Sequence, residues 1–454
     1  MGLFKTIPPP FESQALGTEF LVANDRVFDM SDPGTGKTRK ALDAILKRRK
    51  QGAGKALVFA PRSILVPAWA NDCKKFTPSL KTSVATAKNR AKAFKEDADI
   101  YITNHDAVKW VAQNTEILTD FDILVIDEST AFKHRTSQRS KAMNTIAKHF
   151  PIRWIMTGTP NPNSVTDLWH QVFLLDEGKR LGTSFWKFRA AVCEPQQVGP
   201  DPSHIKWVDK DGAVDVVADL LEDITIRDVF EECVDIPEHS IHTITFTMSP
   251  KHREMYETMR DQAIIELTDE DYDISAPHAG QLANKLLQVA SGAVYNDERI
   301  SKSLASDRNE LVMDLAEQRG QCVIAFNWKH QRDELTKLAD KRGWKYAVVD
   351  GDTKEKQLPI IVNQFQSGEI HYVFAQPQSA AHGLTLTRGT ATIWVSPTYN
   401  AEHFTQLNRR IYRAGQTRKT ETLLVCAEDT LEANVYNKLQ GKLSKMNGLL
   451  DFLT

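Results

Sequence analysis

Two glycines, a lysine and a threonine are closely spaced near the start of the chain, in the run Ser-Asp-Pro-Gly-Thr-Gly-Lys-Thr at residues 31–38. The run at 26–30 before it predicts a strand, and the pattern at 39–50 after it predicts a helix. A glycine-containing loop between a strand and a helix, ending in Lys-Thr, is typical of a site that binds nucleotide phosphates. Ser31 stands where that motif has its first glycine.

The residues of this loop have separate roles in our interpretation. Gly34 and Gly36 would let backbone N–H groups turn toward the phosphates, where the helix N-terminus adds its positive dipole end. Lys37 would reach the β- and γ-phosphates, and the Thr38 hydroxyl would coordinate Mg²⁺. We therefore predict a site for ATP and magnesium that includes Pro33, Gly34, Thr35, Gly36, Lys37 and Thr38.

A pair of carboxylates follows a second apolar run. The run Ile-Leu-Val-Ile at 123–126 predicts a buried strand, and Asp127 and Glu128 come directly after it. A carboxylate at the C-terminal end of a parallel strand can face a phosphate-binding loop. We expect Asp127 to hold Mg²⁺ and Glu128 to act as the general base toward the attacking water.

Hydrolysis also needs positive charge near the γ-phosphate, often from an arginine finger. Arg410 and Arg413 lie in the run 406–416, and their spacing of three would place both on one face of a helix. The alternative is a basic helix that contacts solvent or acidic neighbours. If both act on ATP, the nucleotide binds in a cleft between two domains.

The strands needed to position these residues form two series, each strand followed by a helical pattern. The first series of apolar runs is at 56–60, 100–103, 123–126 and 154–156. The second is at 322–326, 347–349, 372–375, 393–395 and 423–425. Continuous apolar strands that alternate with helices predict an α/β fold with parallel sheets. Between the series helical patterns dominate, so we predict domains at 1–173 and 308–454 and a mostly helical insertion at 174–307.

The composition excludes several classes of protein. With 454 residues, 41% of them hydrophobic and 26% charged, the chain is typical of a soluble globular protein. It has no apolar run long enough to span a bilayer, and its five cysteines form no CxxC pair, so we expect a cytoplasmic protein without zinc or disulfides. The net charge is −2, so binding to nucleic acid would depend on local basic stretches such as 47–50 and 135–141.

The order of these motifs resembles the superfamily 2 helicases and translocases, specifically the Swi/Snf-like branch. The resemblance covers nearly the whole chain. The segments similar to motifs Ia, Ib, II, III, V and VI are 60–65, 102–105, 127–130, 157–161, 382–386 and 406–416. Gln14 matches the adenine-reading glutamine of that family. The resemblance implies two RecA-like domains and a DNA-dependent ATPase, and the chain looks like compact phage or bacterial members, which would place it in the host cytoplasm if a phage encodes it.

The same resemblance assigns further residues. Contacts to a nucleic-acid backbone are implied for Pro61, Arg62, Thr103, Asn104, Asn327, Lys329, His330 and Thr385. Gly383 joins the nucleotide-binding set, and coupling between the two functions is implied for Thr157, Gly158, Thr159 and Gln406. The chain departs from the family pattern at Thr130, where many relatives have His or Asp, and at Ala380-Ala381, where a glycine pair is usual.

We therefore expect an ATP-dependent DNA helicase or translocase that unwinds or branch-migrates forked or junction DNA, in recombination, repair or replication. Its expected partner is DNA and not a membrane, and a monomer is compatible with the sequence. Three alternatives remain: a duplex translocase that does not separate strands, an RNA helicase, and a DNA-binding subunit that uses ATP as a switch. The presence of Lys37, Asp127, Glu128, Arg410 and Arg413 together argues against the last.

Overall fold

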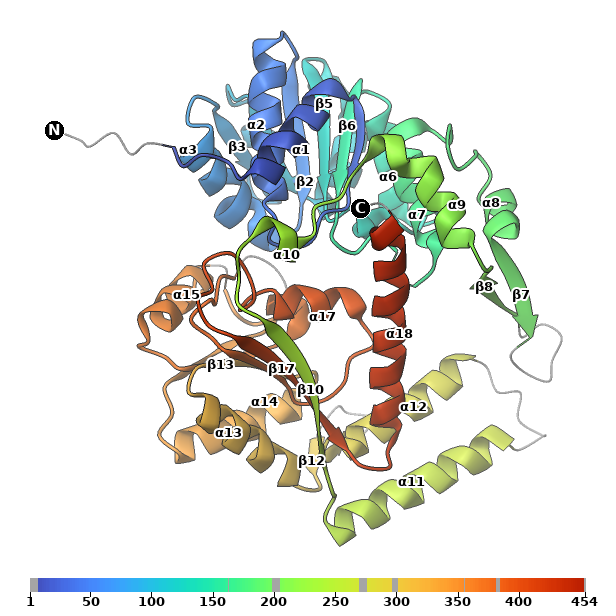
Figure 1. Cartoon of the computed structure of the whole chain (residues 1–454), viewed down its shortest axis with the longest axis vertical. Coiled ribbons are helices and arrows are strands. Elements are labelled where there is room, and N and C mark those ends of the chain that lie inside the picture. The colour runs from blue at the N-terminus through green and yellow to red at the C-terminus, as the bar shows by residue number, and fades with distance from the viewer. Residues whose placement is uncertain are drawn as a thin grey trace. The chain divides into compact units, whose positions relative to one another are not determined.

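The computed structural model describes residues 7–452 except 162, 198–204, 269–275, 296–300, 355 and 381–383. The chain divides into two compact units, one formed by Met1–Asp235 with Lys442–Thr454 and the other by Ile236–Gly441 (Figure 1). Each unit contains its own parallel sheet, which confirms the predicted fold class. Within the described part of the chain, no helix has the length and apolar character needed to cross a membrane.

The sheet of the first unit has seven strands in the order β3-β4-β2-β5-β6-β1-β9. Their bounds are β1 Arg26–Asp29, β2 Lys55–Ala60, β3 Thr82–Ala85, β4 Ile100–Asn104, β5 Phe121–Asp127, β6 Ile152–Met156 and β9 Thr225–Ile226. All neighbours pair in parallel. Because β6 lies between β5 and β1, the loops that follow these three strands meet at one edge of the sheet.

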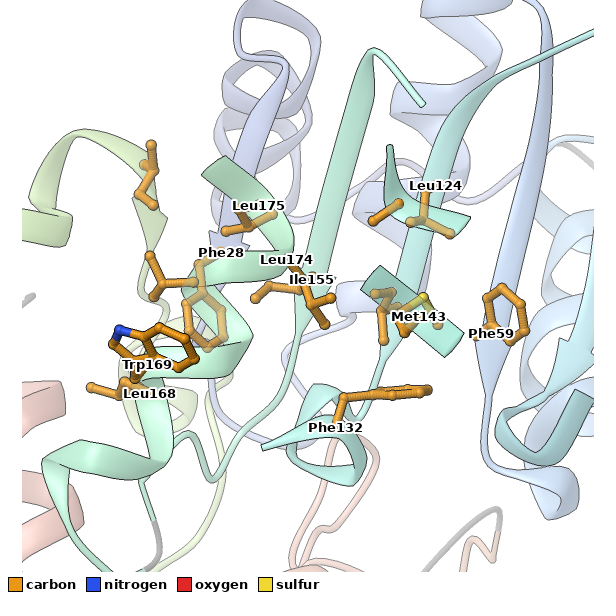
Figure 2. Close-up of a cluster of buried hydrophobic side chains, with 14 of the residues drawn as sticks. Phe28, Phe59, Leu124, Phe132, Met143, Ile155, Leu168, Trp169, Leu174 and Leu175 are labelled. Carbon is orange, nitrogen blue, oxygen red and sulfur yellow. The ribbon is translucent and has the colours of Figure 1, made fainter. Parts of the chain in front are cut away.

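Helices cover both faces of this sheet, and each face has its own apolar core. Along β2, Leu57 and Phe59 pack in one core while Ala56 and Val58 pack in the other, as the two-residue period of a strand requires. Figure 2 shows the first core, where strand residues such as Phe59 face helix and loop residues. Its helices are α5 Val108–Ala112, α6 Gln138–Ala147, α7 Leu168–Asp176 and α9 Ala213–Leu221. The opposite face is covered by α1 Glu12–Ala23, α2 Lys37–Lys50 and α3 Asn71–Phe76.

The second unit has a six-stranded sheet in the order β10-β17-β16-β13-β15-β14. Its strands are β10 His239–Phe246, β13 Cys322–Ala325, β14 Tyr346–Val349, β15 Tyr372–Ala375, β16 Ala391–Trp394 and β17 Thr420–Ala427. Its main helices are α13 Asp307–Arg319, α14 Lys329–Lys341, α15 Leu358–Ser367 and α17 Ala401–Asn408, and α18 Leu431–Phe452 ends among the residues of the first unit.

The stretch 174–307 is divided between the two units. In the first unit it supplies α8 Phe185–Val192, the antiparallel pair β7 Cys193–Gln197 and β8 Ile205–Asp209, and strand β9. In the second it supplies β10, the helices α11 Pro250–Thr268 and α12 Ala276–Ala290, and the pair β11 Ala293–Tyr295 and β12 Ser301–Ser303. The contact boundary at 235 thus differs from the predicted boundaries at 173 and 307, because β9 and β10 extend the two sheets.

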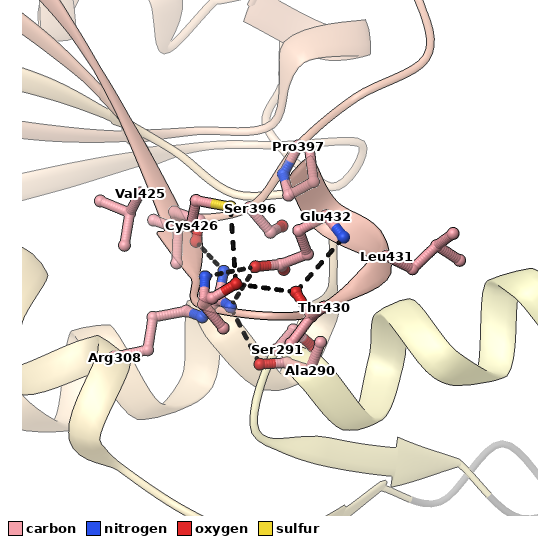
Figure 3. Close-up of polar contacts among 12 residues, drawn as sticks. Ala290, Ser291, Arg308, Ser396, Pro397, Val425, Cys426, Thr430, Leu431 and Glu432 are labelled. Atoms are coloured by element: carbon pink, nitrogen blue, oxygen red, sulfur yellow. Dashed lines mark hydrogen bonds and ion pairs between the residues drawn. The ribbon is translucent and has the colours of Figure 1, made fainter. Parts of the chain in front are cut away.

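A buried ion pair connects the helices of the second unit to its sheet. One guanidinium nitrogen of Arg308 lies 2.6 Å from Glu432 Oε2, and the two side chains are 2% and 0% exposed. The same guanidinium donates to the carbonyls of Val395 at 2.7 Å and Ala290 at 2.9 Å. Figure 3 shows Arg308 between Glu432 and Ala290. These contacts join the ends of α12 and β16 to the starts of α13 and α18.

Candidate active site

The loop between β1 and α2 has the backbone that the glycine spacing predicts. Gly34 and Gly36 have φ angles of 98° and 89°, in the left-handed region that disfavours residues with a Cβ. Gly36 is also the N-cap of α2, and a Cβ at this position would lie 2.3 Å from the Gln14 side-chain nitrogen. Gly36 therefore serves both the turn and the close approach of α1.

Gln14 lies against the loop between β1 and α2. Its Nε2 donates to the Thr35 carbonyl at 3.1 Å, and its Oε1 accepts from the Phe11 backbone N–H at 3.2 Å. The side chain is 8% exposed. The glutamine is thus oriented by the loop itself and by the residue that begins α1.

Lys37 lies over the first residues of the loop. Its Nζ donates to the Ser31 carbonyl at 2.6 Å and to the Asp32 carbonyl at 3.0 Å. Burial lowers the pKa of Lys37, while the carboxylates of Asp29 and Glu128 act in the opposite direction. Lys37 and Glu128 therefore lie within electrostatic range of each other.

The predicted carboxylate pair lies at the end of β5. Asp127 is 5% exposed, and its carboxylate accepts from Trp69 Nε1 at 2.9 Å and from the Glu128 backbone N–H at 3.0 Å. Burial, and then the charge of Glu128, raise the pKa of Asp127 to about 7. A nearby cation would favour its ionised form, and carboxylate and hydroxyl oxygens are donors that Mg²⁺ prefers. Asp127 and Thr38 therefore fit magnesium by their chemistry.

The segment after β6 contacts both halves of the site. Thr157 Oγ1 donates to Glu128 Oε2 at 3.1 Å and accepts from the Thr159 backbone N–H at 3.1 Å. A Cβ on Gly158 would lie 2.6 Å from Cδ of Pro33, so Gly158 touches the phosphate-binding loop. The structure thus brings together the loop, the carboxylate pair and the predicted coupling segment.

A buried polar cluster beside the loop was not predicted from the sequence. Lys40 Nζ lies 2.8 Å from Asp29 Oδ2 and 2.6 Å from Asp228 Oδ2, and it donates to Ser31 Oγ at 3.0 Å. Lys40 and Asp29 have no exposed side-chain surface. An aspartate inside the apolar run at 26–30 was the available signal, because a charge is rarely buried without a partner.

The segment after β9 contacts the same loop through the side chains of the loop residues Asp32 and Ser31. Arg227 lies 2.7 Å from Asp32 Oδ1, and Asp32 Oδ2 accepts from the Phe230 backbone N–H at 3.1 Å. Ser31 Oγ accepts from the Asp228 backbone N–H at 3.0 Å. Ser31, which replaces the usual glycine, therefore joins the loop to Lys40 and to the 227–230 segment.

The prediction that one helical face presents Arg410 and Arg413 is wrong. Helix α17 ends at Asn408, whose side chain accepts from Trp394 Nε1 at 3.0 Å, and the two arginines lie in the turns that follow. Their guanidinium groups nevertheless meet at the Leu384 carbonyl, at 3.4 and 3.3 Å. Tertiary folding and not helical spacing brings these side chains together.

The other predicted residues of motifs V and VI lie close to these arginines. Arg413 donates to Thr385 Oγ1 at 3.0 Å. Gln406 is 2% exposed and donates to Glu402 Oε1 at 3.3 Å, and its carbonyl accepts from Arg410 Nε at 2.7 Å. Gly383 lies outside the described residues.

The residues predicted to contact nucleic acid differ in exposure. In the first unit Arg62 is exposed, and Pro61 and Asn104 are partly exposed. Thr103, by contrast, is fully buried and donates to the Ala85 carbonyl at 2.8 Å, so its side chain offers no surface to a strand.

In the second unit Lys329 is exposed, whereas two predicted neighbours are bonded inside the fold. Asn327 Nδ2 donates to the Ser396 carbonyl at 3.0 Å. His330 is 5% exposed, and its ring nitrogens lie 3.0 Å from Ser291 Oγ and 3.1 Å from the Tyr295 hydroxyl. Burial lowers the pKa of His330 to about 4, so the ring is neutral near pH 7.

This arrangement defines an ATP-hydrolysing enzyme of superfamily 2. The model of the SNF2-related domain matches residues 29–292, and the model of the helicase conserved C-terminal domain matches residues 307–415. The chain therefore belongs to the SNF2-related family of helicases and translocases.

Several known proteins are similar to this chain. The p41 protein of Acyrthosiphon pisum secondary endosymbiont phage 1 is 26% identical over 439 residues, which cover 92% of this chain and 93% of p41. An uncharacterized ATP-dependent helicase of Mycoplasma genitalium is 23% identical, and the matched region covers 88% of this chain but 38% of that protein. The solved Sulfolobus solfataricus SWI2/SNF2 ATPase core in complex with dsDNA aligns with a TM-score of 0.46 and 20% identity, over 99% of this chain and 94% of that one.

Proposed function

We propose that this enzyme is a DNA helicase or translocase that couples ATP hydrolysis to the remodelling of forked or junction DNA. The observation that carries the proposal is the contact of the Thr157–Thr159 segment with both Glu128 and Pro33. A segment that touches the loop and the general base can respond to the γ-phosphate. The exposed Arg62 and Lys329, and the relatives named as ATP-dependent helicases, support nucleic acid as the track.

The chemistry assigns a task to each residue. Lys37 binds the β- and γ-phosphates, and Glu128 accepts a proton from the attacking water while the Thr157 hydroxyl orients its carboxylate. Thr38 and Asp127 would hold Mg²⁺, which when bound supplies positive charge to the phosphate oxygens. Arg410 and Arg413 stabilise the charge that develops on the γ-phosphate in this proposal.

The proposal also gives separate roles to the segments of the chain. Residues 1–173 and 308–454 carry the motor motifs, and 174–307 supplies accessory elements to both units. These elements would contact the DNA beyond the motor's own track. Recombination, repair and replication are the processes in which forks and junctions are the substrates.

The test is the ATPase rate and the strand separation measured with duplex, fork, four-way junction and RNA substrates. We expect the largest stimulation with forks or junctions, together with strand displacement. Displacement of a triplex-forming strand without fork unwinding would show a duplex translocase instead. Stimulation by RNA alone, or slow turnover that ignores nucleic acid, would overturn the proposal in favour of an RNA helicase or an ATP-switched subunit.

A further inference from the structure

Two arginines and two tryptophans of the first unit form a cluster outside the ATP site and the numbered family motifs, and one of them, Arg135, begins the basic stretch 135–141. The guanidinium carbon of Arg135 lies 4.9 Å from the Trp186 ring centroid, and that of Arg189 lies 4.6 Å from the same ring. Arg189 also lies 3.9 Å from the Trp207 ring centroid. We call these four residues the Arg–Trp cluster.

The cluster is assembled from three places in the chain. Arg135 precedes α6, Trp186 and Arg189 belong to α8, and Trp207 lies in β8 opposite Pro195 of β7. Figure 1 shows the β7–β8 ribbon continuing from α8 away from the sheet of its own unit. Trp186 is 57% exposed, so this tryptophan is not a core residue.

The two arginines are held differently from most arginines of the same unit. Arg39, Arg48, Arg49, Arg139, Arg153, Arg180 and Arg227 all pair with carboxylates. Among the described residues, no ion pair involves Arg135 or Arg189, and the buried Nε of Arg189 has no hydrogen-bond partner. Stacking on an aromatic ring fixes the guanidinium plane without using its N–H donors. The terminal N–H groups of the two partly exposed guanidiniums, unlike the buried Nε of Arg189, therefore remain available to a ligand.

The charge near the cluster is positive. Lys206, the residue before Trp207, is exposed. Lys187, the residue after Trp186 in α8, is exposed as well. Positive charge beside stacked guanidinium groups favours an anionic ligand with several regularly spaced charges.

We propose that the Arg–Trp cluster binds the phosphate backbone of a DNA strand, as a contact beyond the family motifs; this inference rests on the proposed function. A planar guanidinium can donate two parallel hydrogen bonds to one phosphate. The exposed indole of Trp186 offers an apolar surface to the sugars and bases, which a purely acidic protein segment would not need. The contact requires no particular sequence, as a motor's track demands.

The experiment compares the wild type with the double variant R135Q/R189Q in binding to fluorescein-labelled forked DNA, followed by anisotropy over a series of salt concentrations. The control is R180Q, since Arg180 of the same unit pairs with Asp176 and Asp223. We expect the double variant to raise Kd roughly tenfold and to lower the slope of log Kd against log salt by about 2. The control should match the wild type, and the DNA-independent ATPase rate should be unchanged in both.

The possible failures are distinguishable. A wild type that binds no DNA at all would refute the proposed function before any variant is compared. A wild type that binds DNA, with a double variant of equal Kd and salt slope, would overturn only the inference about the cluster. If polyglutamate bound the wild type but not R135Q/R189Q, while both proteins bound DNA with equal Kd, the cluster would bind an acidic protein partner instead.

A second variant tests the proposal even if the first variant misfolds. R135K/R189K keeps both charges but removes the planar donors, so it should keep the wild-type salt slope and lose part of the affinity. If it bound DNA as tightly as the wild type while R135Q/R189Q unfolded, stacked guanidinium groups would not be the binding element.

Discussion

Lys40 and Asp29 form a completely buried ion pair between the helix that follows the phosphate-binding loop and the strand that precedes it. Burial disfavours both charges, but mutual attraction outweighs it, so the pKa of Lys40 is raised and that of Asp29 is lowered. A Cβ on Gly17 would lie 2.5 Å from Cδ of Lys40, so α1 closes over this side chain. The Lys40–Asp29 ion pair therefore positions the loop and also contributes to the stability of the first unit.

We predict that Lys40→Met destabilises the first unit by about 3–5 kcal/mol, because Asp29 would remain buried without its cation. The measurement is urea unfolding followed by tryptophan fluorescence. Lys47→Met is the matched control on the same helix, since Lys47 pairs with Glu19 at an exposed position, and it should change stability by less than about 1 kcal/mol. Equal effects of the two variants would refute the role of the buried pair.

Substitutions of Lys37 and Glu128, the two residues proposed to bind phosphate and to act as general base, should separate ATP binding from turnover. Lys37→Ala should abolish hydrolysis and weaken ATP binding, because the loop loses its cation. Glu128→Gln should bind ATP normally and lower kcat by roughly 10²–10⁴-fold, the usual contribution of a general base. Equilibrium binding of a fluorescent ATP analogue and steady-state ATPase rates measure the two effects. Normal turnover by Glu128→Gln would show that another group takes the proton.

Variants at Thr157 test whether the segment after β6 orients Glu128, the proposed general base. Thr157→Val removes the hydroxyl that donates to Glu128 and should lower kcat roughly tenfold with little change in KM for ATP. Thr157→Ser retains the hydroxyl and should restore most of the rate. If the valine and serine variants had the same kcat, the hydrogen bond would have no part in catalysis.

The buried His330 predicts a pH dependence of stability. Its pKa is lowered from 6.5 to about 4, chiefly by burial and further by Arg308. The unfolded state thus binds a proton that the folded state excludes, so the stability contributed by neutral His330 is full above about pH 6.5 and is lost as the pH falls toward about 4. Urea midpoints from pH 7.5 to 4 should fall less steeply for His330→Asn than for the wild type. The exposed His371→Gln should leave the slope unchanged, and a wild-type slope in His330→Asn would contradict the prediction.

Local patterns were sufficient to predict most of the two sheets. The nine apolar runs correspond to β2, β4, β5, β6, β13, β14, β15, β16 and β17, and the helical patterns expected between the two series include α11 and α12. The strand before the loop and the helix after it are β1 and α2. These strands can be recognised from the sequence because a strand buried on both faces is apolar throughout, and such a run is visible within a short segment.

The elements that were missed have weaker local signals. β9 has two residues, and β10 is a largely exposed edge strand, so neither contains a continuous apolar run. Together they assign the middle of the chain to two sheets, where the sequence indicated one insertion. A strand that is defined mainly by its neighbour cannot be recognised from its own residues.

The amino-acid sequence alone determined the chemical groups of this enzyme: the loop with Lys37, the carboxylates Asp127 and Glu128, and the family to which their order belongs. Only the tertiary structure decided which charges are paired and which residues are buried. Asp228 reaches Lys40 from 188 positions away, and Arg410 and Arg413 meet at one carbonyl although their helix has already ended. Burial and ion pairing depend on segments distant in the chain, whereas a motif records only the order and spacing of its own residues.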